Sequence, residues 1–545
     1  MNKRLKPFLF FLGGVVTVCL LAAGIFGLNY ALNFSPKSTG EHKIANKIAD
    51  NISFVPYLKD GNLYFYEAGQ NKLVAENVYS KDSEDPIYTA DYAIDASSGK
   101  VLYTSNRALY LFDGSKTQLI AQNVIAWRTA EGLNNVAFVT STDKEATKGL
   151  LFLWNGGEII SLDNDVVAST LRFSQDGTFV LAQKENVYPK TNYILLKYDL
   201  LGAKTLLNQS TYPIMWVNDD ASTIITGSSE DDEYYYYRIF AQNMKREKKY
   251  ARVYFSAVTP DKSIVYLLHD YDTELKQGVL TAVDLETLKT KEIARGVSFF
   301  NIDGVTDSSK GLLYSVLTDS ENGYSSIYYG EISGKATRLI KNTTEDALYN
   351  IAINSQKKSG YLLTYGATAR DGGVYYVSWN KKDLEVERIA SGNVDSLTYY
   401  ELNHAITFVK NAQSGIAELF VADSTLNATK LTDDCGVEYS PSSQTYSSMS
   451  VLSNSAKECL YFTSVKTGDT TVDQTGTLKL VKDGQIITID ENVSARYMES
   501  PITAGNMDVI FYLKENKDGT LDAYKFEKGE KTLIATNVHG LIEVE

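Results

Sequence analysis

The densest group of potentially reactive side chains is the acidic run at residues 230–233 (Glu-Asp-Asp-Glu), which directly precedes four tyrosines at residues 234–237. Hard oxygen ligands beside aromatic rings could bind a cation or a sugar. The spacing matches no calcium-binding loop, so we interpret the run as a solvated hairpin tip that leads into a strand. The tyrosines of that strand would alternate between its two faces. Residues 303–307 and 432–434 have ordinary turn composition.

Histidine and cysteine limit the other chemistries. The chain has His42, His269, His404 and His539, far apart in sequence, whereas zinc sites use His or Cys at short spacing. No G-x-S-x-G nucleophile elbow and no glycine-rich phosphate loop occurs. The sequence therefore predicts no catalytic residue, no metal site and no cofactor. Isolated histidines of this kind are expected at the surface or in a satisfied core.

The carboxylates and tryptophans leave open a function that involves carbohydrates. The chain has 67 Asp and Glu residues, so a glycosidase with paired carboxylates cannot be dismissed by inventory. The tryptophans fall in different repeats, where they either pack between sheets or stack on sugar rings at an exposed rim. Packing is the favoured interpretation. These residues are Trp127, Trp154, Trp216 and Trp379.

The three cysteines are Cys19, Cys435 and Cys459. Cys19 lies in an apolar N-terminal run. Cys435 ends one repeat and Cys459 lies on a strand of the next, so a disulfide is an option in an oxidising compartment. The alternative is two buried thiols that act as small apolar residues. The sequence does not decide between them.

These side chains must be positioned by a repeated element, which is a short aromatic-rich strand, a turn, and a second strand that ends in a polar stop. It occurs about eleven times between Asn62 and Val538. Four strand-like runs in roughly 45 residues are typical of a β-propeller blade. Clear or weaker copies lie at residues 62–78, 108–124, 150–166, 278–297, 373–394, 476–493 and 521–538.

Each full repeat opens with a polar turn and a short apolar strand. The segments FSQDGTFV at 173–180 and VTPDKSIVY at 258–266 resemble the S-P-D-G-x-x-[VIL] signature of TolB-like and WD40-like propellers. The resemblance extends over residues 52–545 at the level of fold and implies no active site. No repeat has the W-D dipeptide of true WD40 proteins. TolB-like propellers can precede a peptidase domain, but we expect none after Val538.

We predict an all-β fold, a β-propeller of about eleven four-stranded repeats, at residues 52–545. The first repeat lacks its opening strand, and the apolar run Leu541–Val544 is expected to complete it and close the ring. Because propellers usually have four to eight blades, two tandem or nested rings are favoured over one large ring. A division would fall near Val297, although composition marks no linker there.

The N-terminus predicts a membrane anchor. Residues 8–28 form a nearly unbroken apolar run, long enough to span a bilayer, preceded by Lys3, Arg4 and Lys6. The positive-inside tendency places residues 1–7 in the cytoplasm and the rest outside the membrane. A cleaved signal peptide is the competing interpretation, although the run exceeds the usual length. Residues 29–51 read as a polar tether.

The net charge of −14 argues against nucleic acid as a partner. We therefore expect a single-pass membrane protein whose extracytoplasmic propeller binds or scaffolds envelope proteins or glycans. The alternative is a polysaccharide-acting enzyme with two carboxylates in the propeller channel. A carboxylate pair about 5 to 10 Å apart, with one raised pKa, would favour the enzyme.

Overall fold

The structure is a computed structural model that describes residues 44–45 and most of residues 52–542. Most of the described residues lie in strands, and they include two 3-10 turns, Glu131–Leu133 (η1) and Ala168–Thr170 (η2). The gaps after residue 52 are 53, 80–90, 96, 144, 175–176, 187–191, 219–220, 232–233, 243, 260, 302–310, 320–323, 333, 345–350, 355–358, 365–372, 379–384, 401–403, 424, 441–444, 468–473 and 496–500.

Nearly all neighbouring strands pair antiparallel, in sheets of four to ten strands that are built from repeated units, and this arrangement confirms the all-β part of the prediction. The N-terminal half contains β2 (Phe54–Lys59), β3 (Asn62–Glu67), β4 (Gln70–Ala75), β5 (Tyr92–Asp95), β6 (Lys100–Ser105), β7 (Ala108–Phe112), β8 (Thr117–Ala121), β9 (Val124–Thr129), β10 (Val136–Thr140), β11 (Lys148–Trp154), β12 (Ile159–Val167), β13 (Arg172–Phe173), β14 (Phe179–Asn186), β15 (Asn192–Asp199), β16 (Lys204–Thr211), β17 (Ile214–Val217), β18 (Ile224–Asp231), β19 (Tyr234–Ala241), β20 (Arg246–Val258), β21 (Ile264–Asp272) and β22 (Gln277–Asp284).

The C-terminal half repeats the same plan. It contains β23 (Thr290–Asn301), β24 (Gly311–Asp319), β25 (Tyr324–Glu331), β26 (Ala336–Thr344), β27 (Ile351–Asn354), β28 (Ser359–Thr364), β29 (Gly373–Ser378), β30 (Glu385–Ser391), β31 (Val394–Tyr400), β32 (Ala405–Gln413), β33 (Ile416–Ala422), β34 (Ala428–Ser440), β35 (Thr445–Ser448), β36 (Ser450–Leu452), β37 (Cys459–Thr467), β38 (Gln474–Lys482), β39 (Gln485–Ser494), β40 (Ile502–Thr503), β41 (Val509–Glu515), β42 (Leu521–Glu527), β43 (Glu530–Val538) and β44 (Gly540–Leu541).

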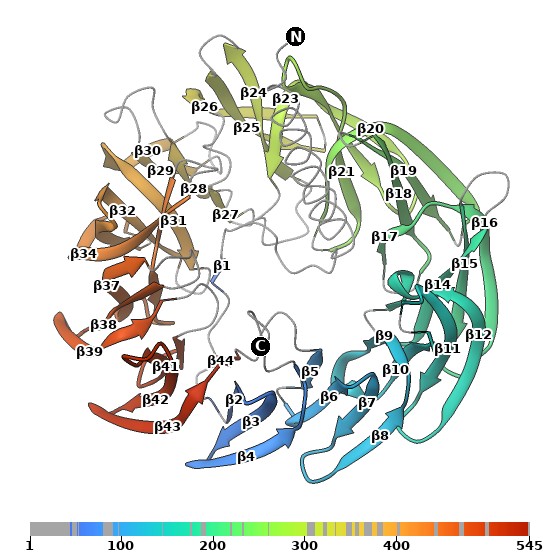
Figure 1. The fold of residues 1–545 in the computed structure, drawn as a ribbon. Coiled ribbons are helices and arrows are strands. Elements are labelled where there is room, and N and C mark those ends of the chain that lie inside the picture. The colour runs from blue at the N-terminus through green and yellow to red at the C-terminus, as the bar shows by residue number, and fades with distance from the viewer. Residues whose placement is uncertain are drawn as a thin grey trace, which may run out of the picture.

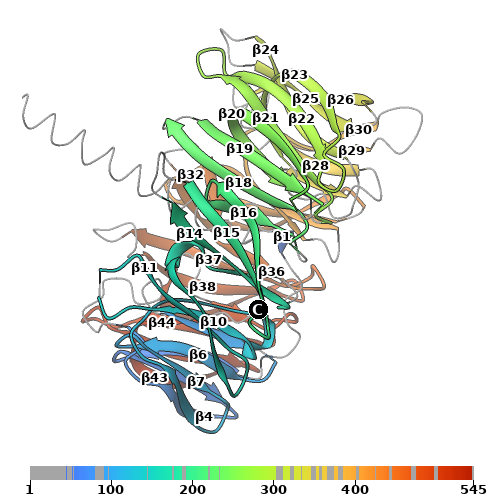
Figure 2. The same cartoon turned by 90° about the vertical axis from the view of Figure 1, so that its right-hand side faces the viewer.

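The units are arranged around a ring in a propeller-like manner (Figure 1). The first strands of the units, such as β9, β17 and β31, lie on the inner side of the ring, and the last strands lie on its outer side. Turned by 90°, the blue and red units lie together at one end of the molecule and the green and yellow-green units at the other (Figure 2). The two ends of the chain's repeat region therefore meet.

Strand β44 joins those two ends. Tyr57 of β2 pairs with Leu541 of β44, so the last strand of the chain completes the first unit. The predicted C-terminal closing strand is confirmed by this pairing. It gives β2 a second hydrogen-bonded neighbour, which removes an exposed sheet edge on the inner side of the ring.

The polar stop of the repeat has a clear conformational reason. The residue before a valine adopts a positive φ at the end of the outer strand, a conformation that suits Asn, Asp and Gly. The valine is then buried between units. In each of the following pairs the first residue has a positive φ and the second is the buried valine: Asn77 and Val78, Asn123 and Val124, Asp165 and Val166, Gly296 and Val297, Asn492 and Val493, and Asn537 and Val538.

The aromatic residues of the repeat form cross-strand pairs between the second and third strands of a unit. Tyr57 and Tyr64, for example, are stacked with ring centroids 5.3 Å apart. Such pairs stabilise a sheet beyond the area that they bury. Equivalent stacked pairs are Tyr103 and Tyr110, Phe138 and Phe152, Tyr314 and Tyr328, Phe408 and Phe420, and Tyr512 and Tyr524.

The described residues cover only some of the segments for which the sequence made predictions. The predicted division near Val297 falls inside β23, whose two ends pair with β22 and β24. Ile44 and Ala45 of the predicted tether form a short strand, β1 (Ile44–Ala45), parallel to β31. The predicted membrane span at residues 8–28 lies outside the described residues. No helix in the described part of the chain is long and apolar enough to cross a membrane.

Candidate functional site

Tyr254 and Tyr271 form a stacked aromatic pair with one exposed ring. Their rings lie parallel, with centroids 4.0 Å apart and an angle of 6° between their planes. Tyr271 is 5% exposed and lies beneath Tyr254, which is 45% exposed. We call this pair the tyrosine platform. It offers solvent a flat ring whose orientation is already fixed.

Two β-bulges place these rings against each other. In the pairing of β20 with β21, Val253 lies opposite His269 and Phe255 lies opposite Leu268, so Tyr254 is an extra residue. The pairing of β21 with β22 is irregular between His269 and Asp272, and Asp270 has a φ of 49°. A bulge bends its strand and re-aims a side chain. The two bulges thus turn both tyrosines out of the regular alternation.

The same pair of bulges occurs elsewhere without the tyrosines. In the pairing of β31 with β32, Ser396 is the extra residue. The corresponding irregularity in β32 contains Asn411, with a φ of 55°, followed by the buried Ala412. The same backbone device therefore recurs in the described unit of β31 to β34, where Ser396 and Ala412 stand in place of the two tyrosines.

Polar and charged side chains surround the tyrosine platform. His269 contacts Asp270 through Nδ1 at 3.0 Å and Thr281 through Nε2 at 2.9 Å. The Asp270 side chain is 63% exposed. Asp272 accepts hydrogen bonds from the backbone N–H groups of Glu274 and Leu275, which orders the turn between β21 and β22. Arg252 donates to the carbonyl oxygen of Tyr271 at 3.1 Å, so the surroundings of the platform contain both acidic and basic groups.

The acidic run singled out in the sequence ends beside the same surface. Glu230 and Asp231 are the last residues of β18, and Asp231 pairs with Tyr234 at the start of β19, so the two strands form an antiparallel pair as predicted. Residues 232–233 lie outside the described residues. Tyr235 pairs with Val253, which places the beginning of β19 next to Tyr254. Tyr235 and Tyr237 lie on the same face of β19, with ring centroids 6.2 Å apart. Tyr237 is buried and hydrogen-bonded to Ser256 at 3.0 Å, and Tyr235 is half-buried.

The tryptophans with described side chains pack into cores. Trp154 is 3% exposed and Trp127 is 9% exposed, and both belong to one core cluster. The indole N–H of Trp127 donates to Asp91 at 2.8 Å. Trp216 packs against another cluster. The packing interpretation holds for these three residues, and Trp379 lies outside the described residues.

The remaining histidines have structural contacts. The Tyr399 hydroxyl contacts His404 Nδ1 at 2.8 Å, and His539 packs against Tyr79 with ring centroids 5.6 Å apart. His42 lies outside the described residues. No group of three or more His, Cys, Asp or Glu side chains in the described part of the chain is placed to hold a metal ion.

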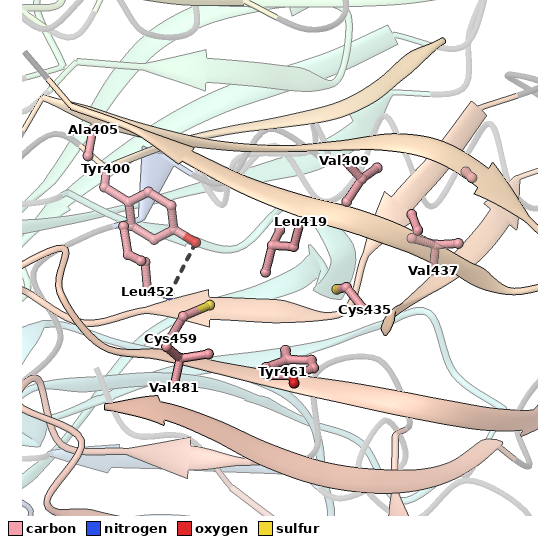
Figure 3. Packing of buried hydrophobic residues seen from close by; sticks show 12 residues of the cluster. Tyr400, Ala405, Val409, Leu419, Cys435, Val437, Leu452, Cys459, Tyr461 and Val481 are labelled. Atoms are coloured by element: carbon pink, nitrogen blue, oxygen red, sulfur yellow. Dashed lines mark hydrogen bonds between the residues drawn. The ribbon is translucent and has the colours of Figure 1, made fainter. Parts of the chain in front are cut away.

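Cys435 and Cys459 are free thiols in one hydrophobic core (Figure 3). Cys435 lies on β34 and Cys459 on β37, and both are fully buried. Burial raises the pKa of Cys459 to about 12 and that of Cys435 well above its usual value. Of the two interpretations left open by the sequence, the structure contains the buried apolar thiols.

A partly exposed carboxylate, that of Asp434, ties two neighbouring units together. Asp434 accepts from Lys479 at 2.7 Å, and Thr432 also donates to it. The predicted turn at residues 432–434 is wrong, because these residues lie within β34. A shallow depression of about 430 Å³ lies beside them, but its charged groups already pair with one another. Residues 303–307 lie outside the described residues.

Sequence reasoning did not single out Tyr254 or Tyr271. The segment RVYFSAV at 252–258 reads as one regular strand, and a bulge leaves no mark on such a short pattern. The adjacency of the two rings depends on the registers of two strand pairs. A comparison of this segment with the corresponding segments of other repeats would have shown an unusual tyrosine at the bulged position.

Comparisons with known proteins give only distant likenesses. No protein family model and no curated protein matches this chain. A solved eukaryotic initiation factor aligns over 90% of this chain and 98% of its own, with 9% identity and a TM-score of 0.43. The β-propeller domain of the trilobed protease from Pyrococcus furiosus aligns over 57% of this chain and 97% of its own, with 14% identity and a TM-score of 0.26.

An acylaminoacyl peptidase from Pyrococcus horikoshii aligns over 66% of this chain and 57% of its own, with 14% identity and a TM-score of 0.25. Likenesses this weak carry no argument about fold or activity. The architecture rests instead on the strand pairing described above.

Proposed function

We propose that this chain is a membrane-anchored, extracytoplasmic binding or scaffolding module for an envelope protein or glycan. The observation that carries the proposal is the exposed tyrosine platform, in which Tyr254 is held flat by the buried ring of Tyr271. Aromatic side chains with a fixed orientation bury large contact area on binding at little entropic cost. The acidic and basic side chains around it favour a partner that has polar groups such as hydroxyls.

The proposed scaffold is one closed ring of eleven blades rather than two rings. Successive hydrophobic clusters each join the sheets of two neighbouring units, as Leu58 and Val101 do in one cluster. A further cluster joins the last unit to the first through Leu513 and Tyr57. Together with the pairing of β2 and β44, this supports a single ring. A rigid ring would hold its surface loops in fixed positions.

The proposed location follows from the N-terminal sequence. The apolar run at residues 8–28 would span the membrane once and leave residues 29–545 outside it. The net charge of −14 suits an extracytoplasmic surface that does not bind anionic lipid. A binding surface near the end of a tether could reach partners in the envelope.

The polysaccharide-acting alternative lacks a supporting observation among the described residues. A general acid needs a carboxyl group with a raised pKa. Every described carboxyl group with a resolved shift has a lowered pKa, as Asp434 and Asp490 do. For both residues burial would raise the pKa, but hydrogen bonds from a lysine and from other donors together outweigh it. We therefore rank binding above catalysis.

The test is photo-crosslinking in intact cells that express the full chain. In one variant of the chain, a photoreactive phenylalanine analogue replaces Tyr254. In a second variant of the same chain, it replaces Leu201, which lies in another unit and is 86% exposed. We expect a specific adduct from position 254 and none from position 201. A discrete band of higher mass indicates a protein partner, and a glycosidase-sensitive smear indicates a glycan.

Competition provides the control for this experiment. Tyr254→Ala in the untagged full chain should fail to compete for the adduct, whereas Leu201→Ala should compete as the wild type does. Equal adducts at positions 254 and 201, or none at 254, would contradict a binding role for the tyrosine platform.

A further inference from the structure

Two inner strands of the ring are covered by segments that lie near the two ends of the chain. Among the described strands, first strands such as β5, β9 and β17 lie at the end of their sheet and have a strand neighbour on one side only. Strand β2 gains a second neighbour from β44. Strand β31 gains one from β1, which belongs to the predicted tether and lies beside β31 on the inner side of the ring (Figure 1).

The pairing of β1 with β31 uses the main chain. The two strands run parallel, with Ile44 opposite Tyr399 and Ala45 opposite Tyr400. Successive residues of a strand point their N–H groups to opposite sides, so the N–H of either Ile44 or Ala45 faces β31. An extended segment that adds to an open sheet edge binds in this mode. The inner edge of β31 therefore acts as an acceptor for a strand.

Contacts with both neighbouring units hold this acceptor edge in place. The Tyr399 hydroxyl contacts Nδ1 of His404 at 2.8 Å, and the Tyr399 ring lies 6.1 Å from that of Tyr361 in the preceding unit. The Tyr400 hydroxyl accepts a hydrogen bond of 3.3 Å from the backbone N–H of Leu452 in the following unit. Both tyrosines are buried. An edge that is fixed before pairing loses little entropy when a segment adds to it.

The covalent connection of β1 to the ring compensates for the shortness of the pairing. A hydrogen bond contributes a net free energy of about 0.5–1.5 kcal/mol, so two paired residues would not hold a separate peptide at low concentration. In this chain, residues 46–53 connect β1 to β2. The pairing is therefore intramolecular, and a short connection gives an effective concentration in the millimolar range.

We propose that the inner edge of β31 is the docking site of the chain's own N-terminal tether, and that this contact fixes where the membrane anchor leaves the ring. Docking leaves residues 29–43 between the apolar run and the ring, a length of at most about 50 Å. Without docking, the first paired residue would be Phe54 of β2, and residues 29–53 could extend to about 85 Å.

The docked tether thus brings the ring closer to the membrane and moves the exit of the anchor from the unit of β2 to the unit of β31. A fixed exit makes every copy of the ring present the same side to the membrane. This consequence rests on the proposed membrane anchor, whereas the docking itself depends only on the pairing of β1 with β31.

The test is hydrogen exchange, measured by mass spectrometry on the purified full chain in detergent. The test variant carries Ile44→Pro and Ala45→Pro together, because proline has no N–H to donate to β31. The control variant carries Ser38→Pro and Thr39→Pro, which is the same change earlier in the tether. Peptides that cover β31 report the pairing. Peptides that cover β9, an inner strand with one described strand neighbour, report any general change in the ring.

We expect slow exchange of backbone amides near the end of β31 in the wild type and in the control variant. In the test variant these amides should exchange about tenfold faster, because the pairing that protects them is lost. Exchange in β9 should be the same in all three proteins. Equal protection of β31 in all three proteins, or no protection in the wild type, would overturn the proposal. Neither result would bear on the tyrosine platform, which the crosslinking experiment tests separately.

Discussion

The carboxylate of Asp163 accepts a hydrogen bond of 2.6 Å from the hydroxyl of Tyr198, a residue of the next unit along the chain. Lys184 and Lys204 of that next unit also contact Asp163, at 2.6 and 2.5 Å. Burial would raise the pKa of Asp163, but these hydrogen bonds outweigh it and lower the pKa. One carboxylate therefore ties the outer strand β12 to its neighbour.

The same tie recurs at other junctions between units. Asp490 of β39 contacts the Tyr512 hydroxyl at 3.0 Å and Lys514 at 2.6 Å in the following unit. Asp434 of β34 contacts the Tyr461 hydroxyl at 3.3 Å and Lys479 at 2.7 Å. The carboxylates of Asp163, Asp434 and Asp490 thus hold neighbouring sheets together.

Replacement of Asp163 by Asn should weaken this junction. The change removes the charge that pairs with Lys184 and Lys204, and we expect a loss of about 1–2 kcal/mol in the free energy of unfolding. Urea denaturation of the full chain measures it. Asp433→Asn is the matched control, because the Asp433 side chain is 73% exposed, and it should cost less than about 0.5 kcal/mol.

The effect should also depend on pH. The pKa of Asp163 is lower in the folded state than its unfolded value of about 3.9. A lowered folded pKa contributes stability above the unfolded pKa, and this contribution disappears as the pH falls toward the folded value. The difference between wild type and Asp163→Asn should therefore be full at pH 7 and shrink below about pH 4. A difference that stays constant down to pH 3 would contradict the assignment.

Much of the fold could be predicted because the repeat is encoded by residues that are close together in the sequence. The aromatic strand pairs, the polar stop before a buried valine such as Val78, and the closing strand at Leu541 all follow from neighbouring residues. Bulges and contacts between units depend on strand register instead. Tyr254 and Tyr271 could therefore not be paired from the sequence. The turn composition at residues 432–434 was misleading because Asp434 serves as a tie within a strand.

The polar stop itself can be tested at Asn492, which has a φ of 55° and precedes the buried Val493. Asn492→Gly should be nearly neutral, because glycine adopts this conformation without strain. Asn492→Val should cost about 1–2 kcal/mol, because a β-branched side chain is disfavoured there. Urea denaturation of the two variants compares them at one position. Equal costs would show that the side chain of Asn492, and not its backbone conformation, matters.

The buried thiols should be inert in the folded protein. At pH 8, a pKa of about 12 keeps Cys459 protonated, and burial holds Cys435 in the same state. Alkylation followed by peptide mass analysis should leave both cysteines unmodified in native buffer and modify both in guanidinium. Two results would contradict this prediction. One is a pair of peptides joined by a Cys435–Cys459 disulfide, and the other is alkylation in native buffer as fast as that of an exposed thiol.

Ring closure gives the sharpest stability prediction. Leu541 is 1% exposed and contributes to the cluster between the last and first units, where its backbone pairs with Tyr57. Leu541→Ala should destabilise the full chain by about 2–4 kcal/mol, and the opened junction should become sensitive to proteases near Val538. Leu533→Ala is the control, because Leu533 is 49% exposed on the neighbouring outer strand and its truncation should change little. If both variants unfold at the same urea concentration as the wild type, the contact made by β44 does not close the ring in solution.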